Sequence, residues 1–141
     1  MAGMKTWGSL VWILLVVFAC HGGTLGLLAL LQTVPAFTEL IVLGVLACAF
    51  FPWAFLVGYV VLVGCLCCQQ VVWWRRADVS GPELRMRQSA LVSLIWHLAG
   101  LVVGIVGWRP GFLLWVTSLP TMLLLHVVCW IMLCVRWWEE A

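Results

Sequence analysis

Three histidines lie within long uncharged stretches of the sequence, where a side chain that can carry a proton is unusual. They are His21, His97 and His126. Ionisable side chains are costly inside a membrane-spanning helix, so they mark either a functional site or a hydrogen bond to a neighbouring helix. Both interpretations stay open here, and hydrogen bonding is the favoured one for His21 and His97.

His126 is followed four residues later by Trp130, so the two side chains share one face of a helix. The segment resembles the H-x-x-x-W motif of the influenza virus proton channel family, over five residues. The resemblance implies that His126 shuttles protons and that Trp130 gates the cytoplasmic side of an oligomeric pore.

Other chemistry has less support in the sequence. Two histidines on neighbouring helices can ligate haem iron, but three histidines fit poorly with the paired ligands of membrane cytochromes. Paired carboxylates, a Ser-His-Asp arrangement and a glycine-rich phosphate loop are all missing, and the longest polar stretch covers only residues 75–87. We therefore expect no enzyme activity, no metal and no cofactor.

Cys65, Cys67 and Cys68 form a cluster at the predicted cytoplasmic end of a span. A C-x-x-C pattern can serve redox or metal chemistry, but cytoplasmic thiols stay reduced. Two interpretations remain. Cysteines close to the membrane surface are sites of S-palmitoylation, and buried cysteines also pack as small apolar side chains.

Two glycine pairs have the spacing of helix-packing motifs. They are Gly22 with Gly26, and Gly100 with Gly104. Small residues four apart let two helix backbones approach closely, which favours association in lipid. We expect a packed interface between the first and third spans, or between subunits, beside His21 and His97.

The composition places these residues in a membrane. Hydrophobic residues make up 66% of the chain and charged residues 9%, whereas soluble domains have about 45–50% and 25%. A surface this apolar is compatible with a lipid bilayer. The net charge of +2 and the absence of a basic stripe argue against nucleic acid as a partner.

The uncharged stretches predict four spans, since a helix needs about 20 apolar residues to cross a bilayer. We place them at residues 7–31, 41–68, 88–108 and 112–135, with a cytoplasmic loop at 69–87 and room for a kink at Pro52. Short turns at 32–39 and 109–111 predict two antiparallel helix hairpins. Residues 1–141 would then form a single all-α transmembrane domain.

Lysine and arginine set the expected orientation, because positive residues favour the cytoplasmic side. Arg109 alone falls on the outer side. Six basic residues fall on the other side: Lys5, Arg75, Arg76, Arg85, Arg87 and Arg136. We therefore expect both termini in the cytoplasm. The plasma membrane and the endoplasmic reticulum both remain open.

Two functions follow from these patterns. The first is a non-enzymatic membrane protein that associates through its helices, as an assembly subunit, adaptor or modulator of a larger membrane protein, or with copies of itself. The second is an oligomeric proton or cation channel of viroporin type that uses His126 and Trp130. The spans read as apolar all round, without a polar stripe, which favours packing contacts over a water path.

Overall fold

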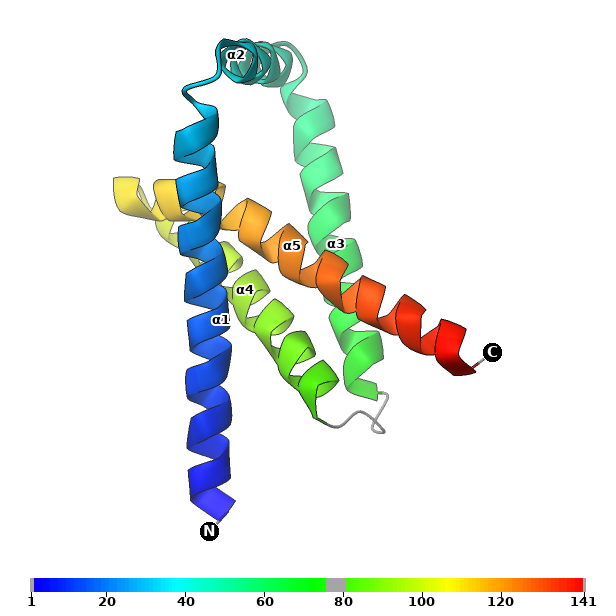
Figure 1. Cartoon of the computed structure of the whole chain (residues 1–141). Helices are drawn as coiled ribbons and strands as arrows, with labels where there is room; N and C mark the ends of the chain where they lie inside the picture. Colours follow the sequence, from blue (N-terminus) through cyan, green and yellow to red (C-terminus); the bar gives the residue numbers. More distant parts are fainter. Residues whose placement is uncertain (1, 76–80, 141) are drawn as a thin grey trace. The chain divides into compact units, whose positions relative to one another are not determined.

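A computed structural model describes residues 2–75 and 81–140 of the chain. All regular structure in this part is helical, and its elements are shown in Figure 1. The helices are α1 (Ala2–Leu31), α2 (Pro35–Phe50), α3 (Pro52–Arg75), α4 (Pro82–Ile105) and α5 (Arg109–Glu140). Residues 76–80 of the predicted polar loop lie outside the described residues.

Four segments of the described helices are long and apolar enough to cross a membrane. They are Trp7–Leu31, Pro52–Arg75, Pro82–Ile105 and Arg109–Glu139. The predicted all-α protein with four such helices is therefore confirmed at this level. The contacts divide the described chain into two units, one formed by residues 2–24 and 81–140 and the other by residues 25–75.

The long uncharged run at residues 40–74 is not one helix. It divides at Phe51, where the backbone leaves the helical region (φ −127°, ψ 54°). The residue before a proline avoids helical dihedrals, and a proline fits the first turn of a helix, so Pro52 starts α3. The span predicted at 41–68 thus differs from the structure, in which the long apolar helix begins at Pro52.

The connection between α4 and α5 lies three residues earlier than the predicted turn at 109–111. Gly107 adopts a positive φ of 93°, and its N–H donates to the Gly104 carbonyl at 3.0 Å. The Trp108 N–H reaches the Val103 carbonyl at 3.4 Å, which completes a Schellman cap. Arg109 already belongs to α5, because proline at 110 is well tolerated in a first helical turn.

Candidate functional site

The tightest packing in the described chain joins α4 to α5 at three glycines. A Cβ atom added to Gly100 would lie 2.8 Å from the Trp115 backbone nitrogen, and one added to Gly104 would lie 3.0 Å from that of Phe112. A Cβ on Gly111 would lie 2.7 Å from the Gly104 nitrogen. The glycines therefore let the two backbones meet. The helix that contacts Gly100 and Gly104 is α5, whereas their spacing predicted contact with the first span or with another subunit.

His97 links the same two helices by a hydrogen bond. Its side chain is fully buried, and its Nδ1 lies 2.9 Å from the Ser118 hydroxyl oxygen. Ser118 also donates to the Trp115 carbonyl at 3.0 Å. The donor of the His97–Ser118 bond depends on the imidazole tautomer, because the hydroxyl oxygen can donate or accept. The Trp115 ring lies tilted against the imidazole, with 6.1 Å between centroids.

A buried polar stripe runs along α4, so the expectation that no span carries one is wrong. Ser89, Ser93 and His97 are four residues apart and all buried, which places them on one helix face. Ser89 donates to the Arg85 carbonyl at 2.9 Å and Ser93 to the Ala90 carbonyl at 2.7 Å. Because both serines bond within their own helix, their hydroxyls are tolerated on a packed face.

The first helix contributes polar contacts of its own to α5. The Thr24 and Thr121 hydroxyls lie 3.1 Å apart, and the Thr117 hydroxyl lies 3.5 Å from His21 Nε2. His21 is half-buried, and among the described residues its Nδ1 has no hydrogen-bond partner. Together with His97 and Ser118, these residues form a polar layer contributed by α1, α4 and α5.

Gly22 and Gly26 lie on the same helix but contact nothing comparable. Both are exposed, and a Cβ added to either would have no other atom within 4 Å among the described residues. The two glycine pairs have the same spacing but different surroundings. Gly100 and Gly104 contact the backbone of α5, whereas the space beside Gly22 and Gly26 is open. Their predicted role in an interface stays a prediction.

His126 and Trp130 occupy different surroundings despite their shared sequence spacing. The His126 side chain is 2% exposed, whereas that of Trp130 is 53% exposed. His126 Nδ1 lies 2.8 Å from the Met122 carbonyl of its own helix. A carbonyl only accepts, so Nδ1 carries the hydrogen. The two positions are about 40° apart around the helix, so within one molecule the histidine lies in the packed part of this face of α5 and the tryptophan at its exposed edge.

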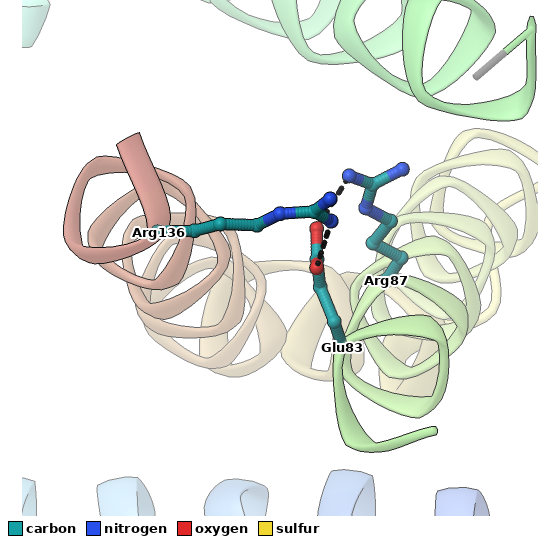
Figure 2. Close-up of polar contacts among 3 residues, drawn as sticks. All are labelled: Glu83, Arg87 and Arg136. Carbon is teal, nitrogen blue, oxygen red and sulfur yellow. Dashed lines mark hydrogen bonds and ion pairs between the residues drawn. The ribbon is translucent and has the colours of Figure 1, made fainter. Parts of the chain in front are cut away.

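Three charged side chains join the start of α4 to the end of α5, as Figure 2 shows. Glu83 accepts from Arg87 at 2.6 Å and from Arg136 at 3.3 Å, one guanidinium on each carboxylate oxygen. Arg87 and Glu83 are mostly buried, while Arg136 is about half exposed. Next to them the guanidinium of Arg85 lies 5.9 Å from the centre of the Trp12 ring of α1, within cation–π range.

The cysteine cluster lies on an exposed part of α3. Cys65, Cys67 and Cys68 are exposed free thiols, and α3 continues for two turns beyond them to Arg75. In residues 2–75 and 81–140, no group of three His, Cys, Asp or Glu side chains is close enough to hold a metal ion.

Sequence reasoning missed the hydroxyl side chains and the ion cluster. Thr117, Ser118 and Thr121 surround Pro120 and form the most polar part of the fourth apolar run, a signal that was available. The four-residue spacing of Ser89, Ser93 and His97 was equally visible. Nothing in the sequence, however, pairs Glu83 with Arg136, which are 53 residues apart.

Comparisons with protein-family models, with curated proteins and with solved structures find no match to the chain.

Proposed function

We propose that this chain is a non-enzymatic multi-pass membrane protein that acts through association of its helices, as an assembly subunit, adaptor or modulator of a larger membrane protein. One observation carries the proposal. The backbone of α5 occupies the space beside Gly100 and Gly104, whereas the space beside Gly22 and Gly26 of α1 is open. In lipid, an open small-residue face favours close packing with another helix.

The polar groups of α4 and α5 support this function because they bond within the molecule. His97 bonds Ser118, His126 bonds a carbonyl of its own helix, and the two buried serines of α4 do the same. The His97–Ser118 bond holds two helices together, and a side chain with a partner inside the protein does not need water as one. Contacts with another membrane protein are then left to the apolar surface and to the helix face of Gly22 and Gly26.

The proposed architecture is two antiparallel hairpins with both termini in the cytoplasm. Contacts between α4 and α5 support antiparallel packing, since Gly104 lies near Phe112, Gly100 near Trp115, and Glu83 near Arg136. Antiparallel helices place Arg85, Arg87 and Arg136 at one end and Arg109 at the other. This separation agrees with the cytoplasmic preference of basic residues.

The test replaces Gly22 and Gly26 by leucine and purifies the tagged chain from its native membranes in mild detergent. We expect the double variant to retain about tenfold less of the associated membrane protein than wild type, an effect of about 1.4 kcal/mol. Gly8→Leu is the matched control, because Gly8 is also an open glycine of α1. Retention of the same partner by the double variant would contradict the proposal, as would a wild-type chain that purifies alone.

The alternative is an oligomeric proton or cation channel using His126 and Trp130. The polar layer of His21, His97 and the α5 hydroxyls favours it, because polar groups at mid-helix can support a conduction path. Liposomes holding the purified chain distinguish the two functions. Acid-activated flux that His126→Ala removes would establish the channel, whereas folded protein without flux would leave association as the function.

A further inference from the structure

We propose that Cys65, Cys67 and Cys68 of α3 form an S-acylation site that receives long-chain acyl groups from acyl-coenzyme A. All three are exposed free thiols. The inference rests on the proposed orientation, with the end of α3 in the cytoplasm, and is independent of the proposed helix association.

The three thiols lie away from the packed face of α3. The buried residues of this helix are Leu66, Gln70 and Trp73, which follow one another by four and three residues and so share one face. Successive residues turn by about 100° around a helix. Cys65 and Cys67 therefore flank that face on either side, and Cys68 lies nearly opposite to it.

The position of the cluster along the helix fits acyl transfer at a membrane surface. Two glutamines follow Cys68 at once and interrupt the apolar run, which then ends at Trp74. Trp74, 70% exposed, and Arg75 end the helix, and tryptophan and arginine are typical of the membrane interface. Cys68 precedes Arg75 by seven residues, or about 10 Å of helix. An acyl chain attached there would enter the adjacent hydrocarbon directly.

The chemistry needs no redox partner. The cysteine sulfur, as thiolate, attacks the carbonyl carbon of the acyl-coenzyme A thioester and forms a new carbon–sulfur bond. The bond to the coenzyme A sulfur breaks, and coenzyme A leaves as a thiol with the proton that the cysteine lost. Each acyl methylene buried in lipid contributes about 0.8 kcal/mol to membrane attachment, so several chains would fix this end of α3 in the inner leaflet.

Two of the four remaining cysteines, Cys129 and Cys48, provide controls. Cys129 is buried in α5. Cys48 is exposed like the cluster, but lies near the end of α2, before α3 begins, which the proposed orientation places on the outer side. Exposure alone would label Cys48 as readily as the cluster, whereas acyl transfer on the cytoplasmic side would not.

The experiment expresses the full chain in eukaryotic cells with an alkyne analogue of palmitate and measures hydroxylamine-sensitive label. We expect label on wild type, loss of most of it in the triple variant Cys65→Ser/Cys67→Ser/Cys68→Ser, and no change in Cys48→Ser. Exchange of each acyl group for a polyethylene-glycol maleimide should shift wild type on a gel in discrete steps, and each single serine variant should lose one step.

Three results would overturn the proposal: wild type without label, label that survives in the triple variant, or label lost in Cys48→Ser. The last of these would also refute the orientation. None of them would bear on the Gly22–Gly26 interface, which the co-purification experiment tests separately. Equal expression and equal gel-filtration profiles of the triple variant and wild type exclude misfolding as the cause of lost label.

Discussion

At the scale of single residues, the hydrogen bond between His97 and Ser118 is the clearest polar link between α4 and α5. Ser118 is 1% exposed and His97 is fully buried, so neither side chain can exchange its partner for water. Removing one partner of a buried pair lowers stability, because no water takes the place of the lost partner.

Ser118→Ala should therefore destabilise the protein by about 1 kcal/mol, the size of a hydrogen bond between membrane helices. The measurement is a titration with sodium dodecyl sulfate, followed by tryptophan fluorescence. Ser93→Ala is the matched control. Ser93 is equally buried but donates only to a carbonyl of its own helix, so its loss should cost much less. Equal effects of the two variants would show that the His97–Ser118 bond has no special weight.

The glycines show how far residue-level prediction reached. The spacing of Gly100 and Gly104 predicts close backbone approach, and the structure places the backbone of α5 against both. The glycine spacing does not identify the partner helix, because a glycine lets any neighbouring helix approach equally closely. Ser118 was overlooked for a related reason: a hydroxyl in an apolar run shows its importance only once its partner is known.

At the scale of helices, the ion cluster joins the first turn of α4 to the last turns of α5. Glu83 is shared by two arginines that differ in burial, Arg87 at 8% and Arg136 at 46% side-chain exposure. An exposed ion pair contributes about 0–1 kcal/mol, whereas a hydrogen bond to a buried charged group contributes about 1.5–3 kcal/mol. The two pairs should therefore differ in strength.

We predict that Glu83→Gln lowers the free energy of unfolding by about 2 kcal/mol, because it leaves Arg87 without its carboxylate. Arg136→Gln should cost less than about 1 kcal/mol, because that arginine is half exposed. The detergent titration compares both with wild type. A larger loss in Arg136→Gln than in Glu83→Gln would contradict this ranking.

The boundaries of helices were harder to predict than their presence. Charge-free length identifies a helix that can cross a bilayer, but a 35-residue run at 40–74 contains no charged residue to mark an end. The helix breaks at Phe51 because Pro52 keeps the residue before it out of the helical backbone region. The Gly107 cap likewise depends on backbone conformation. The sequence Arg109-Pro110-Gly111 is a stronger turn signal, so the turn was predicted at 109–111.

At the scale of the whole molecule, the proposed orientation makes a prediction about access from either side of the membrane. Arg109→Cys should react with a membrane-impermeant maleimide added to intact cells. Glu139→Cys should react only after the membrane is opened. Wild type gives the background from the native cysteines. The opposite labelling pattern would invert the topology, and equal labelling of both positions would rule out an α5 that crosses the membrane.

Composition predicted the class of the molecule more completely than its function. A charge content of 9% already requires apolar surroundings, and four long apolar helices are present in the described chain. A function based on helix association leaves a weaker trace, because it depends on shape along a helix face and not on a set of reactive side chains.

The order of contacts along α4 and α5 also indicates how the pair forms. The contact with the shortest loop joins Gly104 to Phe112, eight residues apart. Longer loops separate Gly100 from Trp115 and His97 from Ser118. Each contact shortens the loop that the next must close, so the entropy cost of every step stays small. We expect rapid zippering from the Gly107 turn outward, with Glu83 and Arg136 pairing last. A nascent chain could thus pair most of α4 with α5 before Arg136 is synthesised.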